Sequence, residues 1–394
     1  MNELLRQFRD FFVSLKLTVA LLALGIVLIF WATLAQTDLG VWGVQQKFFH
    51  SFFVLERIPG TEIPFPLFPG GYFIGGLLFI NLIAAHIYRF RYSWRKTGIW
   101  LTHLGLMILL VGELLSGIWQ QDFQMNFKEG ETRNYSESFR DNELAIIDEG
   151  DPKVDAVVAI PEAILARGEA VQHPKLPFRV VPRLYFPNAE LQQPGAVPNA
   201  PPSIATQGPP FLRTLVPQAQ PLTSKEDERN LPAAYVELVG PDGSLGTWLV
   251  SAEIPVPQHF TDRTGHPWKI ILRIARHYEP YALTLLKVTN DIFPGSDIPK
   301  NFASRVRLQS EDGREAREVV IYMNNPLRYR GLTYYQYQMD KASGTSVLQV
   351  VRNPSWRLPY LACVLMAGGL LFQFGLHLFG FARRRVAGPQ PVRP

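Results

Sequence analysis

Six polar side chains fall inside long apolar stretches of this 394-residue chain. A strongly polar group in a hydrocarbon interior is costly, so each one is a candidate functional residue that needs a partner. Three of the six are histidines, and a neutral imidazole is a good ligand for metal ions and for haem iron. The six residues are Asn81, His86, His103, Glu113, Gln373 and His377.

The three histidines differ in how well their surroundings suit a bound ligand. His103 lies well inside its apolar stretch, and Gly105 beside it allows another helix or a flat ligand to approach closely. An apolar pocket between helices is where a bundle holds a macrocycle. His86 and His377 lie closer to basic residues, where a solvated or headgroup-facing imidazole is the competing interpretation. His103 is therefore the first candidate ligand, and His86 and His377 are secondary candidates.

Four stretches are long enough to carry these residues across a membrane as helices. A bilayer core of about 30 Å needs about 20 mostly apolar residues. The stretches cover residues 17–35, 71–88, 98–119 and 358–381. Gln36, Thr37 and Asp38 follow the first stretch in place of a small-residue cleavage site, so we expect it to remain as a helix.

Basic residues gather on one side of this four-span arrangement, and Lys and Arg are retained on the cytoplasmic side. The flanks on that side carry a net charge of +9 and the rest of the chain −4, which together give the formal +5. We therefore expect an inner-membrane protein with both termini cytoplasmic and no nucleic-acid partner. The basic flanking residues are Arg6, Arg9, Lys16, Arg89, Arg91, Arg95, Lys96, Arg383, Arg384, Arg385 and Arg393.

The long region between the third and fourth stretches reads as mostly β. Short runs such as AAYVELVG and EVVIYMN are bounded by Asp-Gly, Pro and Asn, which favours strands and hairpins in a sandwich or meander. A Pro-rich insertion at 187–232 is expected to form neither a ladder nor a core. The predicted class is an α+β membrane protein, with four transmembrane helices and a large extracytoplasmic β domain between the third and fourth. Its segments are 1–36, 37–70, 71–119, 120–357 and 358–394.

The outward segment 37–70 contains many aromatic residues close to the end of the first stretch. Its string VWGVQQKFFHSFFVLERI predicts an amphipathic helix lying on the outer leaflet. His50 within this string is either a functional residue or an ordinary interfacial side chain.

Several kinds of chemistry are excluded by what the sequence lacks. The single cysteine, Cys363, rules out a disulfide scaffold and any CxxC or CxxCH motif. The histidines of region 120–357 show no HxxxH or HExxH spacing, so a zinc site is poorly supported. No catalytic residue is nominated on these grounds.

Three strings within this topology resemble the ResB/CcsB family of the System II cytochrome c maturation pathway. The strings are GIWLTHLGLMILLVG in the third stretch, NDIFPGSDIPKNFASRVRL, and NNPLRYRGLTYYQYQMD before the last stretch. The resemblance covers nearly the whole chain, and the Pro-rich insertion departs from it.

The resemblance implies that this chain is one subunit of the holocytochrome c synthase (haem lyase) complex. The chain would not be self-sufficient and would need a partner. Its partner would be a CcsA-type membrane protein with a tryptophan-rich WWD motif, which is absent here. The transported substrate would be haem b, delivered outward to the CxxCH motif of apocytochrome c, with thiol-reducing proteins as further partners. The third-span histidine that helps to bind haem in this family, opposite a histidine of the partner, corresponds to His103.

A different class of function is also compatible with the sequence. A membrane-anchored scaffold or sensing protein would use its β domain to bind an extracytoplasmic partner, and its histidines would be only interfacial. A transporter is disfavoured, because four spans without an internal repeat make a poor alternating-access machine.

Overall fold

The computed structural model describes most of the chain, in two compact units. The described residues are 3–58, 60–61, 63–89, 92–151, 154–196, 201–225, 228–292, 299–340 and 343–386. The helical unit comprises Met1–Gln121, Ser224–Glu226 and Asn353–Pro394, and the β unit comprises Asp122–Thr223 and Asp227–Arg352. Two of the basic residues used to predict the orientation, Arg91 and Arg393, lie outside the described residues.

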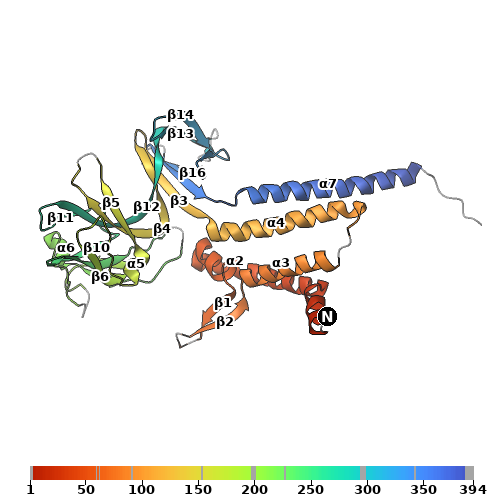
Figure 1. Ribbon diagram of the computed structural model, residues 1–394, viewed down its shortest axis with the longest axis horizontal. Coiled ribbons are helices and arrows are strands. Elements are labelled where there is room, and N and C mark those ends of the chain that lie inside the picture. Colours follow the sequence, from red (N-terminus) through yellow and green to blue (C-terminus); the bar gives the residue numbers. More distant parts are fainter. Residues whose placement is uncertain are drawn as a thin grey trace, which may run out of the picture. The chain divides into compact units, whose positions relative to one another are not determined.

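Four helices of the helical unit are long and apolar enough to cross a membrane, as the sequence predicted. These candidate spans are Leu15–Phe49, Gly71–Tyr88, Trp94–Trp119 and Arg357–Arg383. The first is longer than the expected 17–35. The helices of the unit are α1 (Glu3–Phe12), α2 (Leu15–Val44), the π-helix η1 (Gln45–Phe49), α3 (Gly71–Tyr88), the 3₁₀ turn η2 (Trp94–Lys96), α4 (Thr97–Trp119) and α7 (Arg357–Val386), shown in Figure 1.

The first long helix continues well into the segment expected to lie on the outer leaflet. Gly40 has φ 69° and ψ 170° inside α2, a left-handed conformation that glycine adopts without steric cost. The helix then continues through η1 and is followed by a hairpin of β1 (Phe53–Arg57) and β2 (Pro64–Pro69). The sequence did not indicate this hairpin, because PFPLFP contains three prolines. A two-stranded ribbon tolerates them since one edge of each strand needs no ladder partner.

Helices α4 and α7 pack closely because α4 presents a glycine at every seventh position. Gly98, Gly105 and Gly112 are the buried residues of α4. A Cβ atom at Gly105 would lie 2.6 Å from Met366 Cγ, and one at Gly98 would lie 2.5 Å from the carbonyl oxygen of Gly369. Small residues at such positions allow helix backbones to approach each other in a membrane.

The β unit is built around a 10-stranded sheet in the order β14-β13-β12-β4-β3-β17-β16-β15, with β5 and β11 paired to β4 and β12. A three-stranded sheet has the order β10-β9-β6, and β7 pairs with β8. The elements are β3 (Gln121–Lys128), β4 (Thr132–Asp148), β5 (Ala156–Pro161), α5 (Glu162–Ala166), β6 (Arg179–Phe186), β7 (Ala189–Gln192), α6 (Pro210–Thr214), β8 (Val216–Ala219), β9 (Ala233–Gly240), β10 (Gly243–Ser251), β11 (Gln258–Thr261), β12 (Pro267–Ile292), β13 (Pro299–Ser310), β14 (Ala316–Tyr322), β15 (Leu327–Tyr329), β16 (Leu332–Asp340) and β17 (Thr345–Arg352).

Two long strands, β4 with 17 residues and β12 with 26, run through two separate hydrophobic cores. The first core lies between the large sheet and the three-stranded sheet and includes Ile146, Val236 and Trp268. The second includes Leu283 and Tyr334. The mostly-β prediction is therefore confirmed. The runs KIILRIARHY and LTLLKVTN, which read as two strands, form parts of the single strand β12, and its pairing with β4 shifts register between them.

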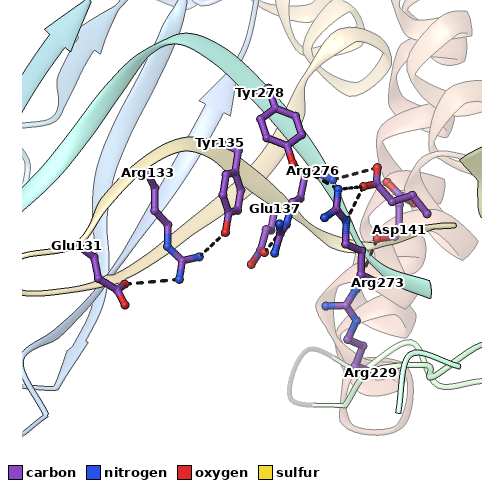
Figure 2. A network of polar contacts seen from close by, with 10 residues as sticks. Glu131, Arg133, Tyr135, Glu137, Asp141, Arg229, Arg273, Arg276 and Tyr278 are labelled. Atoms are coloured by element: carbon purple, nitrogen blue, oxygen red, sulfur yellow. Dashed lines mark hydrogen bonds and ion pairs between the residues drawn. The ribbon is translucent and has the colours of Figure 1, made fainter. Parts of the chain in front are cut away.

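A network of charged and aromatic side chains spans β4 and β12 where the pairing of these two strands shifts register. Arg276 lies over the ring of Tyr135 at 4.3 Å and its Nε lies 3.2 Å from Glu137 Oε1. Arg273 donates from Nε to Glu143 Oε1 at 2.9 Å, a nearly buried ion pair. These pairs hold the two strands together where the regular ladder is interrupted. Figure 2 shows the network with its further members Glu131, Arg133, Asp141, Arg229 and Tyr278.

The Pro-rich insertion contains paired strands and buried residues, which corrects the expectation that 187–232 forms neither a ladder nor a core. β7 and β8 pair within it, with Leu191 opposite Pro217. Leu212 of α6 is buried. Ala189 at the start of β7 is also buried, and a proline fits an edge strand because its missing N–H is not needed there. Residues 197–200 and 226–227 of the insertion lie outside the described residues.

The turn between β11 and β12 is organised by Asp262. Its carboxylate accepts hydrogen bonds from Thr264 N at 2.8 Å, Thr264 Oγ1 at 2.6 Å and Trp268 Nε1 at 3.1 Å. Burial raises the pKa of Asp262, but these bonds and that from the His266 backbone outweigh it and lower the pKa from 3.8 to about 2. The folded protein therefore stabilises the ionised form.

We expect Asp262→Ala to destabilise the β unit at neutral pH but not in strong acid. A depressed carboxyl pKa contributes stability above the unfolded value of 3.8, and the contribution is lost as the pH falls toward 2. The loss should be on the order of 1 kcal/mol, because solvent screens a partly exposed group. Thermal unfolding of the full chain from pH 7 to pH 2 measures it, with the exposed Asp242→Ala as control. A difference from wild type that does not change with pH would contradict this role.

Candidate functional site

The helical unit brings two of the three candidate histidines together. His86 lies near the end of α3 and His103 near the start of α4, and their ring centroids are 4.8 Å apart with planes inclined at 50°. The indole of Trp100, one turn before His103, meets the His86 ring edge to face at 6.4 Å. Both histidines are half-buried. We call His86, His103 and Trp100 the histidine pocket.

Backbone hydrogen bonds set the tautomer of both imidazoles. His103 Nδ1 lies 2.8 Å from Ile99 O, and His86 Nδ1 lies 3.0 Å from Leu82 O. A carbonyl oxygen can only accept, so Nδ1 carries the proton in each ring and Nε2 carries the lone pair. In metal sites, the histidine ligand is oriented in the same way, by a hydrogen bond from the ring nitrogen that does not bind the metal. The Nε2 atom of His86 is enclosed by protein atoms.

His377 does not join the histidine pocket. It is exposed on α7, and its Nε2 lies 3.0 Å from Gln373 Nε2. The amide therefore donates to the nitrogen that would bind a metal. Across the described ranges, no group of three or more His, Cys, Asp or Glu side chains is placed to hold a metal ion. A haem iron does not need such a group of protein ligands, because the porphyrin supplies most of the ligands of the iron.

Asn81 has a structural partner that explains its place in an apolar helix. Its side chain, 4% exposed, accepts from Thr18 Oγ1 at 2.6 Å and donates to Phe12 O at 2.7 Å and Ser14 O at 3.2 Å. The two carbonyls flank the turn between α1 and α2, where Phe12 ends α1 and Ser14 is the N-cap of α2. Asn81 thus fixes this turn against α3.

We expect Asn81→Leu to lower the stability of the helical unit by about 1 to 2 kcal/mol, because three hydrogen bonds are lost inside the bundle. The midpoint of thermal unfolding in detergent measures this loss. Thr33→Val is the matched control, since the Thr33 hydroxyl bonds the carbonyl of Ile29 in its own helix. Equal midpoints for the two variants would show that Asn81 does not hold the turn.

The remaining polar candidates have different surroundings. Glu113 is exposed on α4. His50 follows η1, where its ring stacks on Tyr72 with centroids 5.7 Å apart and its Nδ1 lies 3.3 Å from Gln46 Nε2. This packing accounts for His50 without a ligand.

Sequence reasoning missed two features around His103. Trp100 was interpreted as an interfacial aromatic residue near a span end and not as part of a site. The spacing of Gly98, Gly105 and Gly112 was visible, but only Gly105 was noted, and its neighbour proves to be a helix, α7. The seven-residue repeat was the signal that could have predicted this contact.

Comparison with known proteins gives a family match that lies within the β unit and a partial match to a curated relative. Residues 265–345, which run from the start of β12 to the start of β17, match the ResB-like family. The chain is also 31% identical over 93 residues to Protein NrfI of Wolinella succinogenes. That alignment covers 24% of this chain and 10% of NrfI, so the chain matches about a tenth of the length of this curated relative. The histidine pocket lies outside the residues matched by the family.

Proposed function

We propose that this chain, whose residues 265–345 match the ResB-like family, acts in cytochrome c biogenesis as a haem-handling membrane subunit. It binds haem in the membrane through His103 and works with a CcsA-type partner. Haem is the cargo, which is passed outward for thioether attachment to the CxxCH motif of an apocytochrome c. The arrangement of the histidine pocket is the observation that carries this proposal.

His103 is the preferred iron ligand of the pocket. Its Nδ1 donates to Ile99 O, so in the neutral tautomer Nε2 is the nitrogen that can bind iron, and the ring is held in one orientation. The enclosure of His86 Nε2 supports a different role for that ring. His86 and Trp100 then form an aromatic wall beside the ligand.

The spacing of the two rings supports one iron ligand from this chain rather than two. Imidazole nitrogens bind metals at about 2 Å, so two rings on opposite sides of one iron have centroids roughly 6 Å apart. The observed 4.8 Å is too short for this arrangement. The opposite axial ligand then comes from the partner subunit.

The basic flanks support an orientation in which the histidine pocket is near the cytoplasmic surface. Arg95 and Lys96 lie between α3 and α4, the ends of which carry His86 and His103. Lys and Arg favour the cytoplasmic side, where haem would first be captured. The β unit then lies outside, where an apocytochrome and thiol-reducing proteins would be met.

The proposal is tested by deleting the gene for this chain and by purifying the chain with its partner. Loss of haem-stained c-type cytochromes from the deletion strain and a haem spectrum in the purified complex are expected. Normal cytochrome assembly, together with a complex that shows no haem absorbance, would contradict the proposal and favour a scaffold or sensing protein.

A further inference from the structure

We propose that the corner formed by α1, α2 and α3 binds the phosphate of an anionic phospholipid through Arg9, Lys16 and Arg89, with α1 lying in the membrane interface. The inference does not depend on haem or on which leaflet the corner faces. It rests on an open pocket, its charge, the apolar edge of α1 and the rigidity of the turn.

The pocket is lined by the ends of all three helices. It has a volume of about 630 Å³, and its walls include Arg9 from α1, Lys16 from α2 and Arg89 after α3. Asp10 is the acidic side chain among the lining residues, and it is paired with Arg9 at 2.7 Å. Three basic groups against one acidic group leave the pocket with a net charge of +2. The phosphodiester of a phospholipid carries one negative charge, is attracted to this positive pocket and can accept hydrogen bonds from its cations.

The N-terminus of α2 adds to the positive potential of the pocket. Ser14 is the N-cap, and its hydroxyl accepts from Lys16 N at 3.2 Å. Leu15 and Lys16 of the first turn line the pocket. The unpaired N–H groups and the dipole of a helix N-terminus favour an anion there.

Helix α1 has the apolar face that a membrane-surface helix needs. Phe8 and Phe11 are 63% and 57% exposed, although α1 contacts α3. Arg6 and Arg9 lie three residues apart on the polar part of the helix. A short helix with aromatic residues on one face and basic residues on the other lies in the plane of the interface.

The side chains around the pocket indicate a lipid rather than a soluble anion. Leu15 and Tyr88 line it and are 67% and 63% exposed. Arg9 lies 6.0 Å from the centre of the Tyr88 ring. Basic groups beside exposed apolar groups at the ends of two candidate spans match a headgroup joined to acyl chains.

The corner is rigid before any ligand binds. Arg89 Nη1 donates to Val13 O at 3.2 Å, and Asn81 holds Phe12 O and Ser14 O. The turn between α1 and α2 is thus held by two side chains, that of Asn81 within α3 and that of Arg89 directly after α3. A fixed pocket avoids the entropic cost of ordering its side chains when a ligand binds.

The test is native mass spectrometry of the full chain in detergent with added phosphatidylglycerol or phosphatidylcholine. Lys16→Gln/Arg89→Gln should reduce retained phosphatidylglycerol by tenfold or more, because each basic group near an anionic surface contributes about fivefold to binding. Arg95→Gln/Lys96→Gln is the control. This control variant removes the same charge from a neighbouring flank outside the pocket, so its effect on membrane topology is the same. The control variant should retain the lipid.

Three outcomes would overturn the proposal. The two double variants could lose phosphatidylglycerol to the same extent, or wild type could retain phosphatidylcholine as well as phosphatidylglycerol. Added haem could instead displace the lipid from wild type while the pocket variant binds less haem, which would assign the pocket to haem propionates. Circular dichroism and gel filtration establish that each variant is folded, and the single variant Lys16→Gln provides a milder change.

Discussion

Replacing His103 by alanine is expected to reduce the haem that copurifies with the chain and its partner by at least about tenfold, since loss of even a supporting residue at a metal site costs tenfold or more. The imidazole is held by Ile99 O with Nε2 available to iron, and 4.8 Å to His86 leaves no room for that ring as the opposite ligand. The measurement is the Soret absorbance per mole of purified complex, with c-type cytochrome yield as a second readout.

Two controls separate ligand loss from misfolding. His377→Ala should leave the haem content unchanged, because His377 is exposed on α7 and bonded to Gln373. Imidazole added to His103→Gly should restore part of the absorbance, a rescue that a merely structural histidine would not permit. His86→Ala should change the spectrum less than His103→Ala. Full haem content in His103→Ala would exclude this residue as the ligand.

The apolar helices were predictable because their evidence is local. Runs such as LTVALLALGIVLIF have no alternative to a buried or membrane helix, and the four candidate spans match them. The end of the first span was not predictable in the same way. The polar residues Gln36, Thr37 and Asp38 end the apolar run, but α2 continues past them to Val44 with a kink at Gly40.

The β unit shows where local patterns are not enough. Turn residues such as Pro280 and Asp-Gly pairs indicated strand ends, but β12 continues past Pro280 because both β4 and β13 pair with it. The network of Arg273 and Glu143 joins residues that are 130 positions apart. No spacing in the sequence predicts such a contact, because it depends on the register of the two long strands.

The candidate site was partly predictable. His86 and His103 were singled out by their cost in an apolar stretch, and the short connection between α3 and α4 brings them together. The same argument raised His377 to equal standing with His86, and only the helix packing separates them. Asn81 was identified by the same argument, the energetic cost of a polar side chain in an apolar stretch. Its hydrogen-bond partners, however, lie in a turn that the sequence did not reveal.

The contact between α4 and α7 gives the second large expected effect, through Gly369→Ala. A Cβ at Gly369 would lie 2.6 Å from the carbonyl oxygen of Gly98, 2.7 Å from Thr102 Oγ1 and 2.8 Å from Thr102 N. Two of these are backbone atoms, which cannot rotate away. Overpacking of this kind costs about 1 to 3 kcal/mol. Because Thr102 precedes His103, a displaced α4 should also lower the haem content.

Gly368→Ala in the same helix is the matched control, because a Cβ there meets nothing within 4 Å. Both changes raise intrinsic helix propensity by up to about 1 kcal/mol, so the difference between them isolates the steric clash. The unfolding midpoint in detergent should fall for Gly369→Ala and stay level or rise for Gly368→Ala. If the two midpoints move together, α4 and α7 are not in close contact at Gly98, and the seven-residue glycine repeat then has another cause.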